Sequence, residues 1–268
     1  MLKFLYETCV GRAALKILTN PRLSVFCGEM LDASWSRILI PFFLKKNHIS
    51  LKEYEPKRFE SFNDCFCRKI KRKNRPVDFN PDHLVSPCDG YLSVYPIRQG
   101  RVLPVKQSHY RVADLLRNKE LAEEFEGGTC YVFRLCVHHY HRYCYPDNAH
   151  KEGNTFIPGL LHTVRPIALR NVPVFTENAR EYTLLHTEHF GDVIQMEVGA
   201  MLVGRIRNLH EKACVRRGQE KGYFEYGGST IILMVKKDAV SVNPKWFAAT
   251  KRHIEIPVKQ GQCIGKRG

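Results

Sequence analysis

Two hydrophobic patterns divide the chain. In the first 58 residues, apolar residues recur at helical spacing and alternate with cations, and the Asn20-Pro21 pair ends the first apolar segment. This region therefore predicts N-terminal amphipathic helices over residues 1–58. From about residue 86 onward, short runs rich in β-branched and aromatic residues are separated by Gly, Pro and Asp, which is typical of strands joined by turns.

The second pattern predicts a β-rich core domain over residues 59–268. Strands are expected at 91–97, 129–137, 193–206 and 229–235, whereas residues 111–125 predict one clear helix. Helices outside a sheet core make the expected fold class α+β. A length of 268 residues and a hydrophobic fraction of 44% supply enough apolar material for one large core.

The apolar run ILIPFFLKK, residues 38–46, is a candidate membrane contact. It is too short to cross a hydrocarbon layer about 30 Å thick, and it contains Pro41. Flanking cations are typical of a helix that lies in the membrane interface. The same residues are equally expected in helices that pack on the core, so the run alone leaves both interpretations open.

The charge balance indicates an anionic partner. The chain has 42 Lys and Arg against 27 Asp and Glu, a formal net charge of +15, which favours nucleic acid or acidic lipid. Six cations fall within residues 68–75, and at roughly 1 kcal/mol each they would contribute at most about 6 kcal/mol on an anionic leaflet. No nucleic-acid-binding motif accompanies them. Together with the apolar N-terminal runs, this favours an anionic phospholipid membrane and no nucleic acid.

The ten cysteines predict free thiols rather than a disulfide framework. The N-terminus shows no sustained apolar signal-peptide region, so we expect a reducing compartment in which most cysteines are free and buried. Neither the Cys65/Cys67 pair nor the Cys130/Cys136 pair has the spacing of a structural zinc site. These spacings therefore predict no metal site.

Two glycines stand at the entrance of the apolar run STIILMV. Gly227 and Gly228 precede Ser229, and strand interiors usually avoid glycine, so a bent or strained backbone is expected there. A simple turn or β-bulge is the plainer interpretation. Upstream, the turn SPCDG contains Asp89, and the segment HHYHRYCYP contains His141 and Cys144. These positions supply an acid, a base and a hydroxyl in chain order, although scattered triples of this kind are common.

Taken together, these motifs resemble the phosphatidylserine decarboxylase family. The GGST element is similar to the family's processing site, and its coincidence with the other motifs makes the assignment much stronger than any one of them. The stretches that carry the resemblance follow the family's order over roughly residues 60–265: FNDCFCRKIKRKNRP, SPCDG, YHRYCYPDN, LLHTVRP, FTENAREY, FGDVIQMEVGAMLVGRI, KGYFEYGGSTIILM and GQCIG.

The resemblance implies self-cleavage between Gly228 and Ser229. In this family the serine attacks the preceding carbonyl and is converted into an N-terminal pyruvoyl group, a covalent cofactor that here would derive from Ser229. Gly228 would leave the attacked carbonyl accessible, and Asp89 matches the aspartate of the processing triad. The products would be residues 1–228 and residues 229–268. The pyruvoyl group would then accept electron density as carbon dioxide leaves an amine-bearing substrate.

The sequence departs from the family's histidine motif D-Y-H-R-x-H-x-P. His141 retains the first histidine, which the resemblance associates with decarboxylation. Cys144 replaces the second, which would be the base of self-cleavage, and His139 replaces the aspartate. A thiol with an ordinary pKa near 8.5 needs nearby cations to act as a base at neutral pH. The role therefore falls to Cys144, to His141, or to His138 or His139.

The leading hypothesis is a pyruvoyl-dependent decarboxylase, made as a zymogen, that converts phosphatidylserine to phosphatidylethanolamine. We expect it as a peripheral protein at the cytoplasmic face of the cell membrane, and the resemblance leaves a homodimer of processed heterodimers open. The alternatives are an unprocessed lipid-binding relative and a pyruvoyl decarboxylase of another amine-bearing substrate. Gln107 and Arg165 replace a family glycine and asparagine, and these changes would favour a different head group or lost activity.

Overall fold

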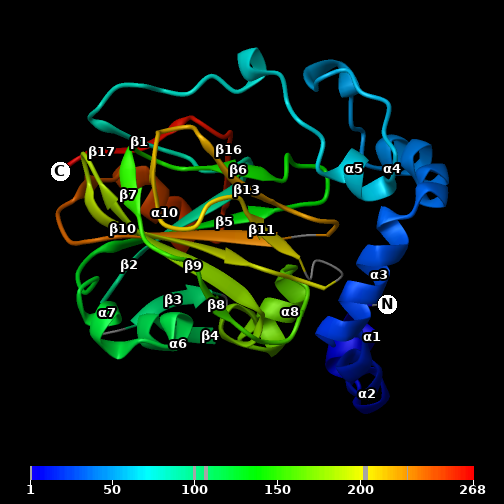
Figure 1. Cartoon of the computed structure of the whole chain (residues 1–268). Coiled ribbons are helices and arrows are strands. Elements are labelled where there is room, and N and C mark those ends of the chain that lie inside the picture. The colour runs from blue at the N-terminus through cyan, green and yellow to red at the C-terminus, as the bar shows by residue number, and fades with distance from the viewer. Residues whose placement is uncertain (1, 99–100, 106–107, 202–204, 228) are drawn as a thin grey trace.

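A computed structural model describes residues 2–98, 101–105, 108–201, 205–227 and 229–268. Helices gather at the N-terminus, and a large antiparallel sheet with further helices occupies the rest of the chain (Figure 1). The predicted α+β fold with a β-rich core is therefore confirmed. The domain boundary between residues 58 and 59 stays a prediction.

The N-terminal helices begin at polar capping residues. The Thr8 hydroxyl accepts a hydrogen bond from Gly11 N at the start of the second helix, and the Asn20 side chain accepts one from Arg22 N at the start of the third. Asn20-Pro21 therefore ends one helix, as predicted, and also begins the next. The elements of this region are α1 (Leu2–Glu7), α2 (Cys9–Leu18), α3 (Pro21–Asp32), η1 (Ser34–Leu39), α4 (Ile40–Lys46), η2 (Leu51–Glu53), α5 (Phe62–Phe66) and η3 (Arg72–Asn74).

The rest of the chain is mainly strands. They are β1 (His83–Val85), β2 (Gly90–Pro96), β3 (Arg101–Val105), β4 (Ser108–Arg111), β5 (Thr129–Leu135), β6 (Arg142–Cys144), β7 (Ala149–Lys151), β8 (Thr155–Ile157), β9 (Arg180–Thr187), β10 (Gly191–Val198), β11 (Ile206–Asn208), β12 (Ala213–Val215), β13 (Glu220–Phe224), β14 (Ser229–Val235), β15 (Val240–Ser241), β16 (Ile256–Val258) and β17 (Cys263–Arg267). The predicted strands at 91–97, 129–137 and 229–235 correspond to β2, β5 and β14. The strand predicted at 193–206 ends early, at Val198.

The main sheet has nine strands in the order β12-β7-β9-β10-β14-β5-β2-β16, with β8 paired to β9, and its pairs are antiparallel. On β14, Ile232 and Met234 pack into one core cluster, whereas Ile231 and Leu233 pack into another. The three-stranded sheets β11-β13-β6 and β1-β17-β15 contribute to the second cluster. Every residue of β14 is buried, so this strand lies at the centre of the fold.

The prediction of one continuous helix at 111–125 is wrong, because this segment forms two short helices. The chain forms α6 (Val112–Leu116) and α7 (Lys119–Glu123), separated by Arg117 at a left-handed φ of +49°. The side chain of Asn118 accepts a hydrogen bond from Leu121 N and so starts α7 as a separate helix. This half of the chain also contains α8 (Pro166–Asn171), α9 (Val174–Glu177) and α10 (Pro244–Lys251).

An ion pair is buried between the main sheet and β13. Lys221 Nζ lies 2.7 Å from Glu197 Oε2, and neither side chain is exposed to solvent. Asn208 accepts a hydrogen bond from Lys221 and donates one to Glu197. Polar residues that alternate along an antiparallel strand usually face water, but here β11, β13 and β6 cover that face. The charges are therefore tolerated only as a hydrogen-bonded pair.

Removing one partner of this pair should be costly. We expect Lys221→Met to lower the free energy of unfolding by about 3–5 kcal/mol, because Glu197 would remain as an uncompensated buried charge. Chemical denaturation in a Ser229→Ala background, which keeps one continuous chain, measures the effect. The double variant Lys221→Met/Glu197→Gln should recover much of the loss, and strictly additive losses would contradict this interpretation.

Candidate functional site

Three neighbouring strands of the main sheet place the predicted residues at the same end of the sheet. Strand β14 begins at Ser229, β5 ends at Leu135 and β2 begins at Gly90. Ser229 pairs directly with Leu135, and β2 follows β5 in the sheet order. Because neighbouring strands lie about 4.8 Å apart, the start of β2 is about 10 Å from Ser229. Asp89 directly precedes that start, so the SPCDG turn and Ser229 lie at the same end of the sheet.

The Ser229 side chain is fully buried, and its hydroxyl has no hydrogen-bond partner among the described residues. Leaving a buried hydroxyl unpaired costs about 1–3 kcal/mol, and such groups call for an explanation, a catalytic role among them. Two residues earlier, Gly227 has φ +129°, a conformation that a side chain would strain. The expected unusual backbone is therefore present at Gly227. Gly228 lies outside the described residues.

His141 is a buried, neutral imidazole with one free nitrogen. Its Nδ1 lies 3.0 Å from the carbonyl oxygen of His139, so Nδ1 carries the proton and donates. Its Nε2 is buried and has no partner among the described atoms, while the ring packs on Phe66 with centroids 4.2 Å apart. Burial lowers the pKa of His141 to about 3, although the nearby backbone carbonyls of His139 and Gly227 oppose this shift. His141 is therefore a neutral imidazole close to Gly227, and its Nε2 can accept a proton.

Cys144 is also buried, but its surroundings suppress ionisation. Its backbone N–H donates to Pro87 O at 2.8 Å, and its Sγ lies 3.9 Å from Ser86 O, so it packs against the SPCDG turn. Burial raises the pKa of the thiol to about 12, and the charges of Asp89 and Glu220 add to this effect. A thiol in this position stays protonated at neutral pH.

Asp89 is held by a cation and a backbone amide. Arg75 Nε lies 2.7 Å from Oδ1 and 3.0 Å from Oδ2 of Asp89, and Gln260 N donates to Oδ1 at 2.9 Å. The two side chains are 9% and 8% exposed, respectively. Hydrogen bonding and charge from Asp89 raise the pKa of Arg75 even though burial opposes this. Within the described residues, Asp89 makes no hydrogen bond to His141 or Cys144, so the structure brings these groups to one region without linking them as a triad.

The basic run is only partly available to a membrane. Arg68 is buried and stacks on Tyr54, with its guanidinium carbon 4.3 Å from the ring centroid, and Arg75 is occupied by Asp89. The six-cation estimate is therefore wrong, and the remaining four cations would contribute at most about 4 kcal/mol. Those four are Lys69, Lys71, Arg72 and Lys73.

Asp89 and His139 also line an open cavity of about 550 Å³. His139 Nδ1 accepts a hydrogen bond from Cys136 N, and burial lowers the pKa of this histidine to about 4. The other lining residues include cations and polar groups from several segments: Asn47, His48, Ser50, Glu53, Arg75, His138, Tyr140, Lys259 and Gln262. The cavity can therefore accept a polar group next to Asp89, with Lys259 as a cation beside the Arg75–Asp89 pair.

Sequence reasoning missed the partners of the predicted residues. Arg75 appeared as one cation of a run, and Gln260 belongs to no motif with recognised chemistry. The only available signal was the position of Gln260 directly before the GQCIG stretch. Of the two other departures, Arg165 precedes α8 as its N-cap residue, while Gln107 lies outside the described residues.

The low pKa of His141 predicts a loss of stability in acid. Unfolded histidine binds a proton near pH 6.5, whereas folded His141 does so only near pH 3, so the unfolded state binds more protons between these values. The free energy of unfolding should therefore fall as pH decreases below about 6.5. Denaturation of the Ser229→Ala chain from pH 7 to 4.5 should show a smaller slope in the His141→Gln variant. The exposed His150→Gln serves as control, and equal slopes in both variants would contradict the assignment.

Comparison with known proteins gives one family. The family model described as phosphatidylserine decarboxylase matches residues 62–266. The protein named phosphatidylserine decarboxylase proenzyme 2 of Clostridium acetobutylicum is 41% identical over 266 residues, which is 99% of this chain and 91% of the relative. The phosphatidylserine decarboxylase proenzyme of Clostridium novyi is 39% identical over 272 residues, covering 99% and 92% of the two chains. The chain belongs to the phosphatidylserine decarboxylase family.

Proposed function

We propose that this chain is a proenzyme that cleaves itself before Ser229 and then decarboxylates phosphatidylserine to phosphatidylethanolamine. The single observation that carries the proposal is the buried Ser229 hydroxyl at the start of β14, for which the described residues provide no hydrogen-bond partner. In the described part of the chain, Nε2 of the nearby His141 has no hydrogen-bond partner, and the Gly227 backbone is close enough to affect the pKa of this ring. The names of the relatives, which are proenzymes of phosphatidylserine decarboxylase, support both steps.

In the first step, His141 Nε2 accepts the hydroxyl proton of Ser229 as Oγ bonds to the carbonyl carbon of residue 228. The amide nitrogen then leaves that carbon and takes up the proton, which gives an ester. His141 Nε2, neutral again, takes the α-proton of residue 229 as the Cβ–Oγ bond breaks, which leaves a carboxylate on the larger chain and a dehydroalanine at residue 229. Water then hydrolyses the carbon–nitrogen bond at residue 229, the first residue of the smaller chain. This releases ammonia and leaves an N-terminal pyruvoyl group.

His141 suits the role of base better than Cys144 does. Burial favours the neutral form of both groups, but the neutral form of histidine is the proton acceptor, whereas the neutral form of cysteine is not. Cys144 would need a cation to become a thiolate, and the charges that act on it are those of Asp89 and Glu220. His139 already uses its acceptor nitrogen on Cys136 N. We therefore assign Cys144 to packing against the SPCDG turn.

Asp89 holds together the segments that meet at this end of the sheet. Its ion pair with Arg75 and its hydrogen bond from Gln260 N connect the SPCDG turn to the loop before β17. Gln260 Nε2 also donates to the carbonyl oxygens of Pro87 and Arg142, so it ties this turn to β6. The segment that carries His141 and the start of β14 are thus held in one arrangement.

The surroundings of residue 229 fit a pyruvoyl group. The pyruvoyl group is small and uncharged, so it would take the place of the Ser229 hydroxyl inside the buried strand without burying a charge. The group would supply a carbonyl that reacts with the substrate amine and an adjacent amide that accepts electron density as carbon dioxide leaves. His141 Nε2 would hold or deliver a proton there, and the cavity beside Asp89 would take the anionic head group of the lipid.

Intact mass measures self-cleavage directly. We expect wild-type protein to consist of residues 1–228 and a hydrazine-reactive chain of residues 229–268, and Ser229→Ala to remain one chain of about 31.1 kDa. His141→Gln should also stay uncut or be cleaved at least 100-fold more slowly, because a well-placed general base contributes 10²–10⁴-fold. Cys144→Ala should be processed.

The same samples distinguish the alternatives. Processed wild type should release carbon dioxide from phosphatidylserine vesicles, and Ser229→Ala should not. An uncut wild-type chain would contradict the proposal and favour a lipid-binding relative without self-cleavage. A processed chain that acts on a soluble amino acid but not on the lipid would instead indicate a different amine-bearing substrate.

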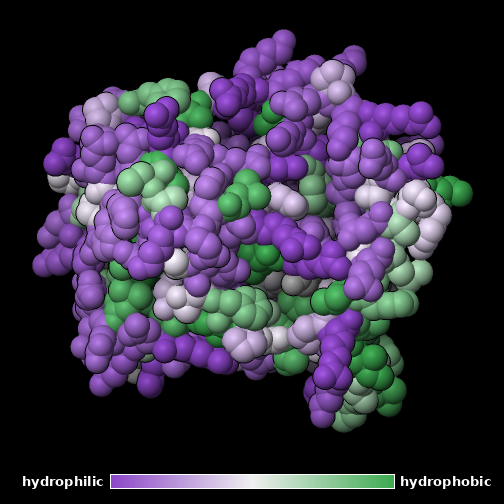
Figure 2. Space-filling view, in the orientation of Figure 1, coloured by the Kyte–Doolittle hydropathy of each residue, from purple (hydrophilic) through white to green (hydrophobic). Residues whose placement is uncertain are grey.

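The N-terminal helices expose the apolar surface that a peripheral membrane protein needs. Figure 2 shows apolar residues along the outer, right-hand edge of these helices. None of the described helices is long and apolar enough to cross a membrane. The exposed large apolar residues of this region are Phe4, Val10, Ile17, Val25, Phe26, Met30, Trp35, Ile38, Leu39 and Phe42. Lys45 and Lys46 lie exposed beside them on α4, and Lys46 Nζ is 5.5 Å from the Phe42 ring centroid. We propose that this face lies in the interface of an anionic phospholipid membrane, at the cytoplasmic side of the cell membrane.

Vesicle sedimentation tests the membrane face. Ile38 and Phe42 are 79% and 67% exposed, and an inserted side chain of this size contributes about 1.5–3 kcal/mol. Ile38→Ser/Phe42→Ser should therefore bind phosphatidylserine-containing vesicles at least tenfold more weakly than wild type. The control Phe156→Ser removes a residue that is 58% exposed on β8 and should bind normally. Equal weakening in both variants would contradict the assignment.

A further inference from the structure

Three metal-ligating side chains meet outside the site described above. Asp78, His83 and Cys263 each offer one ligand atom, and these atoms all lie within 4.8 Å of one another. Each residue is partly exposed, so an ion can reach the group from solvent. The cysteine spacings considered in the sequence could not reveal this group, because it includes one cysteine only, and Cys263 lies 180 residues after His83 in the chain.

The fold holds the three residues together before any ion binds. Strands β1 and β17 pair with Val85 opposite Cys263 and with an irregularity between residues 84 and 85, which brings His83 and Cys263 onto adjacent strands. Asp78 N donates to Gly261 O at 3.0 Å, and Asp78 Oδ2 lies 2.7 Å from His83 Nδ1. The donor set is therefore preorganised by main-chain contacts that a ligand substitution would leave intact.

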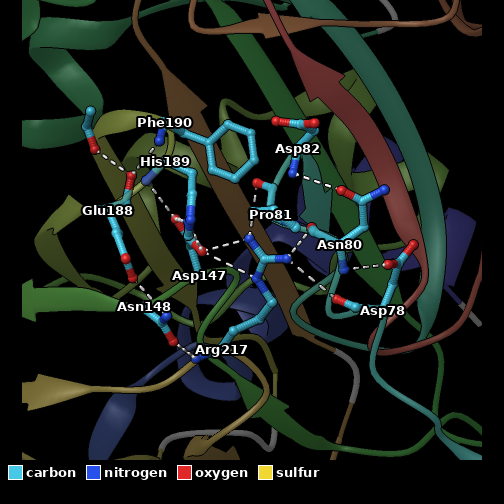
Figure 3. Close-up of polar contacts among 12 residues, drawn as sticks. Asp78, Asn80, Pro81, Asp82, Asp147, Asn148, Glu188, His189, Phe190 and Arg217 are labelled. Atoms are coloured by element: carbon cyan, nitrogen blue, oxygen red, sulfur yellow. Dashed lines mark hydrogen bonds and ion pairs between the residues drawn. The ribbon is translucent and has the colours of Figure 1, made fainter.

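Arg217 fixes the loop that carries Asp78. Figure 3 shows its guanidinium between Asp147 and the loop of residues 78–81. It lies 2.7 Å from Asp147 Oδ1 and donates to the carbonyl oxygens of Asp78, Asn80 and Pro81. Both charged side chains of this ion pair are buried. Asp147 and three carbonyls satisfy the hydrogen bonds of Arg217, but its charge still acts on Asp78 and Cys263 and would weaken the affinity for a cation.

The donor atoms suit zinc. A carboxylate oxygen, an imidazole nitrogen and a thiolate sulfur are the ligands that Zn²⁺ takes at about 2.0–2.3 Å, which would place them roughly 3.3–3.8 Å apart around a tetrahedral ion. The three ligand atoms now lie within 4.8 Å of one another, and Asp78 Oδ2 is 2.7 Å from His83 Nδ1. Small side-chain adjustments would therefore bring them to the distances that a tetrahedral ion requires. Water would fill the fourth position. Lys266, whose charge acts on Cys263, would weaken the affinity for a cation.

We propose that Asp78, His83 and Cys263 bind one Zn²⁺ ion. If the chain is cleaved before residue 229, as proposed above, Asp78 and His83 belong to the larger product and Cys263 to the smaller one. The ion would then join the two products at the β1-β17 pair. The binding site itself does not depend on cleavage, whereas the joining of two chains does.

Cobalt titration tests the site in the uncut Ser229→Ala chain. We expect one equivalent of Co²⁺ to give a thiolate-to-metal charge-transfer band together with the visible bands of a tetrahedral site, and Zn²⁺ to displace it. Cys263→Ser should abolish the charge-transfer band, and His83→Ala should weaken binding at least tenfold. The matched control Cys214→Ser removes an exposed thiol and should bind as the parent does. Absence of the band, or its persistence in Cys263→Ser, would overturn the proposal.

Processed protein provides the second measurement. Added Zn²⁺ should raise the denaturant concentration at which the two chains separate, and His83→Ala should remove this shift without altering cleavage. A shift of equal size in His83→Ala would overturn the joining role. If wild type proves to be uncut, the proposed self-cleavage fails while the cobalt titration still decides the metal site, so the two failures are distinguishable.

Discussion

The pairing of β14 with β10 and β5 is the constraint on which the rest of the structure depends. It places an all-buried strand at the centre of the main sheet. It also fixes Ser229, the first residue of that strand, opposite Leu135 at the end of β5. Because the hydrogen bonds of β14 are satisfied by both neighbours, residue 229 can be chemically altered while the strand stays in place. The two products of cleavage would remain associated through these same ladders. Two residues before the strand, Gly227 has an unusual φ of +129°.

Desolvation has opposite chemical consequences for the two residues that compete for the role of base. It lowers the pKa of His141 to about 3 and raises that of Cys144 to about 12, so both are neutral at pH 7. Neutral imidazole retains a lone pair on Nε2, because Nδ1 donates to the His139 carbonyl. A neutral thiol offers no comparable acceptor. Replacement of the family's second histidine by cysteine is therefore compatible with self-cleavage if His141 takes the proton.

Much of the fold could be predicted from the sequence, because its signals are local. The short run of apolar and β-branched residues at 229–235 predicted β14, and Asn20-Pro21 predicted a helix end. The continuous helix at 111–125 failed because Asn118 caps a new helix after a left-handed Arg117. The motifs predicted which residues gather at the site, but their partners required the tertiary structure. Arg75 appeared to be a membrane-facing cation and instead binds Asp89. Asp78 and Cys263 are brought together by the β1-β17 pairing and by the hydrogen bond from Asp78 N to Gly261 O.

The state of the His141 ring tests the central claim most directly. Nitrogen-15 NMR of the uncut Ser229→Ala chain, with the His141→Gln spectrum used to assign the signal, reports both tautomer and protonation. The account predicts a neutral ring with its proton on Nδ1 throughout the range from pH 7 to 5, since the pKa lies near 3. A proton on Nε2, or a charged imidazolium at pH 6, would mean that His141 has no free acceptor nitrogen for Ser229, and the account would be contradicted.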